Sequence, residues 1–182
     1  MGPGALAVRK PDGRRAAATV VLLLLPVLGA CTGEGPGDGG EEPAPAFEAP
    51  SLKGETVSLE EMEGNVVLLN IWATWCPPCR DEMPDLQQIH EEHYDDGLRV
   101  VGVSIDGGGS DESVRRFLDD LGIDFLILRD PRDRVSQDFA VRGVPASFLI
   151  DREGMIRWRH MGPLTADDPD LREALDDLLA TE

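Results

Sequence analysis

The chain has 182 residues, of which 41% are hydrophobic and 29% charged, a composition typical of a soluble globular domain with some additional sequence. Its formal net charge of −18 argues against nucleic-acid binding, which relies on clustered Lys and Arg. The same charge disfavours adhesion of the folded surface to anionic lipid. We therefore expect no nucleic-acid partner and a well-solvated acidic surface.

Residues 1–30 are typical of an export signal peptide. A run from Ala16 to Leu28 is apolar apart from Thr19, and it ends in the small residues Gly29 and Ala30. The run follows a basic start made of Arg9, Lys10, Arg14 and Arg15. A basic region, a short apolar region and a small-residue cleavage site define a secretory signal, and the run is shorter than the ~20 residues of a membrane span.

The sequence Leu28-Gly29-Ala30-Cys31 resembles the lipobox of bacterial lipoproteins. The resemblance implies that the signal is removed before Cys31 and that this cysteine carries a lipid anchor. The alternative is an uncleaved signal anchor with an incidental cysteine. If Cys31 is lipidated, the three cysteines of the chain reduce to the pair Cys76 and Cys79, and export permits a disulfide between them.

Residues 31–46 form a predicted linker between the anchor and the folded domain. The sequence TGEGPGDGGEEPAPA from residue 32 to 46 contains Gly, Pro and acidic residues but no large apolar one. Such a segment cannot bury enough apolar surface to order itself, so it is expected to act as a tether. The folded domain is predicted to occupy residues 47–182.

The domain begins with a predicted hairpin over residues 52–57, with its turn at Lys53-Gly54. Short apolar runs then predict strands over residues 66–72, 98–105, 125–128, 147–150 and 155–159. Amphipathic spacing predicts helices from Pro77 to about Tyr94, from Ser110 or Asp111 as the cap to Leu121, around 135–139, and over 168–179. Strands that alternate with helices and end in a hairpin predict a mixed central sheet with helices on both faces, an α/β fold.

Two cysteines lie where a buried strand meets a helix, in the sequence Trp75-Cys76-Pro77-Pro78-Cys79. A bridge between them closes almost no loop, so it would stabilise the fold little. The pair must therefore be metal ligands, a redox couple or a coincidence. Open α/β sheets place their functional sites at such strand ends.

Thiol-disulfide exchange needs a thiolate nucleophile, a resolving thiol and access for a partner. Cys76 is predicted at the helix N-terminus, where the helix dipole stabilises a thiolate, and Cys79 follows one turn later. Pro77 and Pro78 remove two backbone donors, while the Cys79 amide remains. Nearby acids (Asp81, Glu82 and Asp85) oppose a low thiol pKa by repulsion. We expect a moderately lowered pKa for Cys76 and a reducing couple.

The motif and its surroundings resemble the TlpA/ResA-like thiol-disulfide oxidoreductases of the thioredoxin fold and the redoxin (AhpC/TSA) superfamily. The resemblance extends from Ala46 to Leu179 and is carried by the opening 47–59 and by the blocks NIWATWCPPCRDEMPDL, VVGVSID and GVPASFLIDREGMI. It implies a thioredoxin-like fold with an N-terminal β-hairpin. It also implies that Cys76 and Cys79 form the redox-active disulfide.

The resemblance assigns further site residues. Glu82 lies where an acidic residue of the ResA-like branch is implicated in proton transfer, and the alternative is an ordinary acid in the first turn of a helix. Gly143-Val144-Pro145 is similar to the family's cis-proline loop. Together with Trp75, Pro77 and Pro78, Val144 and Pro145 are expected to line the groove for the partner protein. Asn70 stands where thioredoxins carry a buried Asp, and Ala146 where Thr is common.

These observations predict a monomeric enzyme on the outer face of a bacterial cell membrane, anchored through Cys31. It would reduce disulfides in exported client proteins, with apocytochrome c as the client that the resemblance implies, and a membrane thiol-disulfide electron donor would reduce it again. No NADPH or flavin motif is visible, so no cofactor is expected. The alternative direction is oxidation of newly exported proteins.

Other chemistries fit the sequence less well. A zinc site needs more ligands than one CxxC, so no metal is expected. A copper(I) chaperone is an alternative because two thiolates bind soft metals, although such proteins usually have a three-residue spacer. A peroxidase would need the different motif of peroxiredoxins. A purely structural lipoprotein leaves Trp-Cys-Pro-Pro-Cys unexplained.

Overall fold

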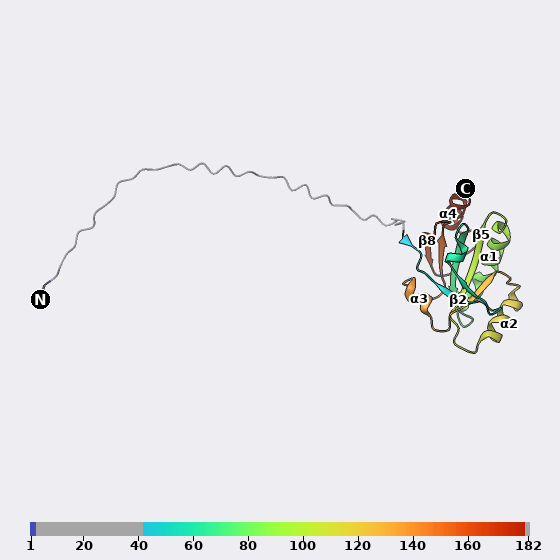
Figure 1. Cartoon of the computed structure of the whole chain (residues 1–182), viewed down its shortest axis with the longest axis horizontal. Coiled ribbons are helices and arrows are strands. Elements are labelled where there is room, and N and C mark those ends of the chain that lie inside the picture. Colours follow the sequence, from blue (N-terminus) through green and yellow to red (C-terminus); the bar gives the residue numbers. More distant parts are fainter. Residues whose placement is uncertain (3–41, 181–182) are drawn as a thin grey trace. The chain divides into compact units, whose positions relative to one another are not determined.

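The computed structural model describes residues 1–2 and 42–180, and the chain divides into two units, residues 1–36 and 37–182. All the described helices and strands belong to the second unit (Figure 1). Residues 3–30 of the predicted signal peptide, Cys31 and most of the predicted linker lie outside the described residues.

A six-stranded sheet in the order β1-β8-β7-β4-β5-β6 forms the centre of the domain. Its parallel half consists of β4 (Val66–Trp72), β5 (Leu98–Ser104) and β6 (Leu126–Arg129). Its antiparallel half consists of β7 (Ala146–Ile150), β8 (Met155–Met161) and β1 (Glu42–Pro43). The sheet is therefore mixed, as the sequence predicts, and β4 lies inside it with a neighbour on each side.

Every residue of β4 is buried because both faces of the sheet are covered. Leu68 and Trp72 join one hydrophobic cluster, to which the helices α1 (Pro77–His93), α2 (Asp111–Leu121) and α4 (Pro169–Leu179) contribute. Leu69 and Ile71 join a second cluster on the other face. That cluster includes residues of the short helices η1 (Glu60–Met62) and α3 (Arg134–Asp138) and of the hairpin strand β2 (Glu48–Pro50), which pairs with β3 (Thr56–Ser58).

The predicted thioredoxin-like architecture with an N-terminal hairpin is confirmed. Some details differ from the sequence prediction. The hairpin was predicted over residues 52–57, but its strands are β2 and β3, and Lys53-Gly54 lies in the turn that joins them. Glu42 and Pro43 pair with β8, inside the range assigned to the linker, because sheet pairing requires backbone groups and no apolar side chain. The predicted cap position of α2 is confirmed, because Ser110 is the N-cap residue, but its hydroxyl donates to the Gly107 carbonyl and accepts from Arg129 instead of bonding the helix amides.

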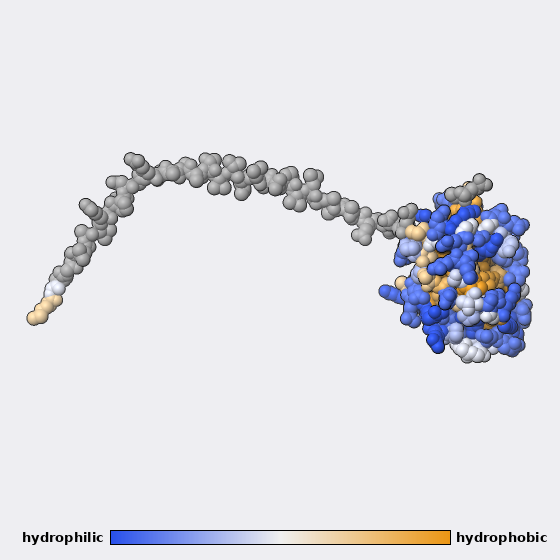
Figure 2. Space-filling view, in the orientation of Figure 1, coloured by the Kyte–Doolittle hydropathy of each residue, from blue (hydrophilic) through white to orange (hydrophobic). Residues whose placement is uncertain are grey.

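The surface of the folded domain is mostly hydrophilic on the face shown in Figure 2, where apolar side chains gather in a central patch. This agrees with a well-solvated surface. No helix among residues 1–2 and 42–180 is long and apolar enough to cross a membrane.

Gly102 allows β5 to pack closely beneath the aromatic residues of the core. A Cβ atom there would lie 2.9 Å from Nε1 of Trp72 and 3.2 Å from Cε2 of Phe125. Trp72 is fully buried, and its ring stacks on Phe117 with centroids 5.2 Å apart, so it has little room to move. The absence of a side chain at Gly102 is therefore a packing requirement rather than a turn requirement.

Gly102→Ala should lower the free energy of unfolding by about 1–3 kcal/mol, because the added methyl group overpacks a rigid core. Urea denaturation of the oxidised protein measures this change. Gly107→Ala is the matched control and should be almost neutral, since a Cβ atom added at Gly107 would meet nothing within 4 Å. Equal unfolding midpoints for Gly102→Ala and the unchanged protein would contradict the packing argument.

Candidate active site

The cysteine pair occupies the junction between β4 and α1. Cys76 is the N-cap residue of α1, and Pro77 and Pro78 form its first positions, where the missing amide hydrogens leave no helix bond broken. The two cysteines form a disulfide with an S–S distance of 2.11 Å. The backbone N–H of Cys79 donates to Sγ of Cys76 at 3.2 Å. This is the one amide that the sequence left available to the nucleophilic sulfur, and it favours a thiolate there.

The cysteines and their neighbours differ in exposure. Cys76 retains 4% of its surface whereas Cys79 has none, so only Cys76 keeps any contact with the surface. Pro77 and Pro78 are exposed on the same turn. Trp75 is 64% exposed, in contrast to the fully buried Trp72. An exposed indole beside the reactive sulfur offers a contact surface for another polypeptide, as the sequence predicts for Trp75.

The loop before β7 closes the other side of the disulfide. The peptide bond between Val144 and Pro145 is cis, as the sequence predicts. The Val144 carbonyl oxygen lies 3.7 Å from Sγ of Cys76. Pro145 is buried and Val144 half-buried. Residues 68 positions apart in the chain are thus brought together at the sulfur.

Glu82 is a buried carboxyl group one helical turn after Cys79, with only 1% of its surface exposed. Its Oε1 accepts from the side-chain amide of Asn70 at 2.9 Å, and its Oε2 accepts from the backbone N–H of Leu164 at 3.0 Å. Burial, with a smaller contribution from the nearby Asp85, raises the pKa of Glu82 to about 7 against these two hydrogen bonds. A carboxyl group with this pKa can exchange a proton near neutral pH.

Asn70 and Ser147 complete the surroundings of Glu82 from the sheet side. They are directly opposite each other on β4 and β7, and the Asn70 amide also donates to Oγ of Ser147 at 3.0 Å. Both side chains are fully buried. Sequence reasoning noted Asn70 as a departure from thioredoxins but missed Ser147 and the Leu164 amide. Only the antiparallel register of β4 and β7 reveals that Ser147 belongs to the site.

A second buried network holds the segment before Cys76. Asp106, at the end of β5, accepts hydrogen bonds from the backbone N–H of Thr74 at 3.0 Å and from the Thr74 hydroxyl. Arg129 donates to the backbone carbonyls of Ser104 and Asp106, both at 3.2 Å. The sequence reasoning did not find this network. Its one available signal was a polar residue directly after the buried strand in VVGVSID.

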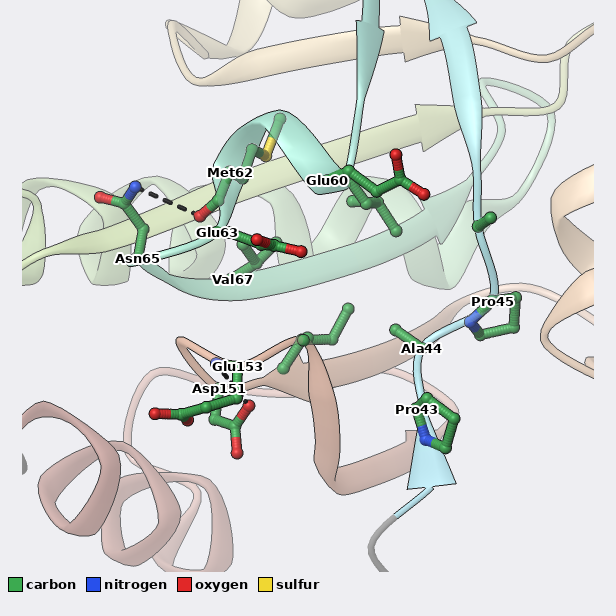
Figure 3. A pocket seen from close by; sticks show the side chains of 14 residues that line it. Pro43, Ala44, Pro45, Glu60, Met62, Glu63, Asn65, Val67, Asp151 and Glu153 are labelled. Atoms are coloured by element: carbon green, nitrogen blue, oxygen red, sulfur yellow. Dashed lines mark hydrogen bonds between the residues drawn. The ribbon is translucent and has the colours of Figure 1, made fainter.

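The cavity drawn in Figure 3 lies at the opposite end of the sheet from the disulfide. It has a volume of about 200 Å³ and touches Val67 at the start of β4 and Ile150 at the end of β7, whereas the cysteines follow the end of β4. Its acidic lining includes Asp151, whose oxygens accept hydrogen bonds from the turn amides of Glu153 and Met155 and from Arg157. Asp151 therefore stabilises a hairpin turn. Among the described residues, no three His, Cys, Asp or Glu side chains are arranged to hold a metal ion.

Comparisons with known proteins agree with this geometry. Residues 41–159 match the AhpC/TSA family. The chain is 38% identical over 134 residues to the thioredoxin-like protein YneN of Bacillus subtilis, covering 73% of this chain and 78% of that protein. It is 35% identical over 124 residues to the thiol-disulfide oxidoreductase ResA of Halalkalibacterium halodurans, covering 68% and 69% of the two chains.

Solved structures show the same fold. A thiol:disulfide interchange protein of the thioredoxin family from Chlorobium tepidum superposes with a TM-score of 0.66 at 26% identity, covering 79% of this chain and all of that one (100%). The family match exceeds half of the chain, and both relatives are more than 30% identical to it over at least two thirds of each chain. The chain therefore belongs to the AhpC/TSA family and, within it, to the ResA-like thiol-disulfide oxidoreductases.

Proposed function

We propose that this protein reduces disulfide bonds in exported client proteins on the outer face of the cell membrane, with Cys31 as its lipid anchor. The observation that carries the proposal is the buried carboxyl group of Glu82 one turn from the resolving Cys79. The lipobox-like sequence before Cys31 supports the location. Apocytochrome c is the client that we propose from the family resemblance, and a membrane thiol-disulfide protein would supply the electrons.

The reaction begins with the reduced protein. The Cys76 thiolate attacks one sulfur of the client disulfide, so that a Cys76–client bond forms and the client's own S–S bond breaks. The departing client sulfur leaves as a thiolate and takes up a proton. The amide of Cys79, which lies 3.2 Å from Sγ of Cys76, stabilises the attacking thiolate.

The second step resolves the mixed disulfide. Glu82, as a carboxylate, accepts the proton of the Cys79 thiol, and the resulting thiolate attacks Sγ of Cys76. The Cys76–Cys79 bond forms, the second client sulfur leaves, and two electrons have passed to the client. Burial of Cys79 protects its thiol from solvent and from other proteins, so general-base help from a neighbouring group is valuable there.

The client is expected to bind along Trp75 and the Val144-Pro145 loop. Trp75 offers an exposed aromatic face, and the half-buried Val144 offers backbone groups beside the sulfur. An extended client segment can pair with such a free backbone, which gives affinity with little sequence specificity. This mode suits a protein that must accept several unfolded clients.

The reduction potential of the Cys76–Cys79 pair decides the direction of the reaction. We expect a value near or below about −220 mV, as in reductases, because the acids around α1 oppose thiolate formation. Equilibration with a dithiothreitol or glutathione series, followed by thiol counting, measures it. A value near about −120 mV would instead indicate an oxidase of exported proteins.

Cys79→Ser should trap the mixed disulfide between Cys76 and a client, because the resolving thiol is absent. Non-reducing electrophoresis with a peptide containing an oxidised CxxCH sequence measures the trapped species. Cys76→Ser is the matched control and should form almost none, since the remaining Cys79 is fully buried. Equal trapping by both variants would contradict the assignment of Cys76 as the nucleophile.

Glu82→Gln should slow the resolving step by about 100-fold at pH 7.5, the magnitude usual for loss of a general base. In the unchanged protein the rate should rise as pH passes through about 7, because Glu82 is protonated below its raised pKa and ionised above it. Stopped-flow Trp fluorescence with an oxidised peptide measures the profile. Asp81→Asn, an exposed acid in the same helical turn, is the control for a simple dipole effect, and an equal loss in both variants would contradict the role of Glu82.

A further inference from the structure

Asn70 has one buried polar atom without a hydrogen-bond partner. Its amide nitrogen donates to Oε1 of Glu82 at 2.9 Å and to Oγ of Ser147 at 3.0 Å, but its Oδ1 is buried and accepts nothing. An unpaired buried acceptor is unfavourable and therefore rare in folded proteins. An apolar side chain at position 70 would have no such unpaired oxygen, and an ionised Asp would have no N–H donor for Glu82. The presence of an amide at this position therefore requires an explanation.

The present orientation of Asn70 suits only one protonation state of Glu82. An ionised carboxylate accepts hydrogen bonds at both oxygens, and here Asn70 and the Leu164 amide supply one donor to each. A protonated carboxyl group carries an O–H donor on one oxygen. If the proton takes the position of either existing hydrogen bond, its O–H faces an N–H, and two donors then oppose each other.

Only one of the two opposing donors can change. The Leu164 N–H is fixed by the backbone, so the proton must reside on Oε1, opposite Asn70. A rotation of about 180° around the last side-chain torsion of Asn70, which is a soft torsion, exchanges its nitrogen and oxygen. Oδ1 would then accept from the Glu82 O–H, and also from the Ser147 hydroxyl, which can donate as well as accept. Each orientation leaves one amide group unpaired, so neither is strongly preferred by itself.

We propose that Asn70 is a positioning residue whose side-chain amide rotates with the protonation of Glu82, so that the buried carboxyl group keeps its hydrogen bonds in both states. The inference rests on the proposed function in that it explains how Glu82 takes and returns a proton. Ser147 keeps a hydrogen bond to the amide in either orientation, because its hydroxyl can accept from the nitrogen or donate to the oxygen. An Asp at position 70 could not do this, since its ionised form has no donor.

The groups that face Glu82 allow both of its states near neutral pH. Asp85 lies one turn further along α1, and Cys79 lies one turn before, where it becomes a thiol when the protein is reduced. From the sheet, the neutral side chains of Asn70 and Ser147 face Glu82. Ser147 pairs in turn with His160 on the neighbouring strand β8. None of the described hydrogen bonds or ion pairs of Glu82 involves a basic side chain, and burial accordingly raises its pKa.

The decisive measurement follows two side chains in the oxidised full chain, held in a mild detergent, between pH 5 and 9. NMR would record the side-chain amide signals of Asn70 and the carboxyl carbon of Glu82. We expect both to change with one common midpoint. In Glu82→Gln, which resembles the protonated acid, the Asn70 signals should stay at their low-pH positions throughout. Asn70 signals that remain constant while Glu82 titrates would overturn the proposal.

Two variants sharpen the test. Asn70→Leu has a similar volume but no amide, so the Glu82 midpoint should rise by about one to two pH units when the carboxylate loses its donor. His160→Gln is the matched control and should leave the common midpoint unchanged. If the Asn70 amide signals no longer change with pH in His160→Gln, the proposal is overturned, because the amide would then respond to His160 and not to Glu82. If Asn70→Leu fails to fold, the spectra of the unchanged protein and of Glu82→Gln still decide.

The outcomes separate this inference from the proposed function. An amide that rotates with Glu82, in a protein whose Glu82→Gln variant reduces clients at the original rate, would support the rotation and remove Glu82 from the reaction. A static amide in a protein whose Glu82→Gln variant is slow would do the reverse. Peptide reduction and the NMR titration are therefore measured on the same variants.

Discussion

The register between β4 and β7 is the constraint on which the site depends. Ile71 pairs with Ala146 and Asn70 with Ser147. This alignment brings the end of β4, and hence Cys76, beside the start of β7, and hence the Val144-Pro145 loop. A shift by one residue would turn every side chain of one strand to the opposite face. Asn70 and Ser147 would then no longer face each other beneath α1, and the hydrophobic clusters on the two faces would lose their alternation.

The same register explains why a carboxyl group can be buried in this domain. Glu82 points from α1 toward the sheet, where a hydrophobic residue would be expected, and its neighbours in the helix at positions 79, 83 and 86 are all part of the core. Two donors satisfy its oxygens, but no counter-charge from a basic side chain is among its described partners. Burial therefore raises its pKa instead of being offset by an ion pair. A buried carboxyl group without a counter-charge is unfavourable for folding, and this one lies one helical turn from Cys79.

A network of paired charges at the end of β5 supports the segment before Cys76. Arg129 is almost completely buried, and it satisfies backbone carbonyls at the end of β5 while it forms an ion pair with Asp111 at 3.0 Å. Asp106 in turn fixes Thr74, two residues before Cys76. The buried polar side-chain atoms of this network all have hydrogen-bond partners, as buried polar groups usually do. The surroundings of Glu82 differ, because Oδ1 of Asn70 has none. Among the described residues, an unpaired buried atom therefore lies beside Glu82, and none lies in the network behind Thr74.

The sequence alone was sufficient to predict the fold class, the boundaries of β4 and the location of the reactive pair. These follow from local rules: apolar runs predict buried strands, and a CxxC motif before an amphipathic helix predicts sulfur at a helix N-terminus. The cis bond at Pro145 was predicted through the family resemblance and is confirmed. Trp75 was assigned to the partner groove from its position beside Cys76, and it is exposed. The short pairing of Glu42 and Pro43 with β8 was not predicted, because backbone pairing leaves no signal in side-chain patterns.

The tertiary structure decided which residues surround Glu82. The sequence left open whether Glu82 is a surface acid of the first helical turn or a buried one, because its spacing fits both. Its burial depends on the rotation of α1 over the sheet, and its partners come from positions 70, 147 and 164, which are far apart along the chain. Local patterns determine which elements form, but the meeting of distant polar groups depends on strand register and helix packing, and these are properties of the whole fold.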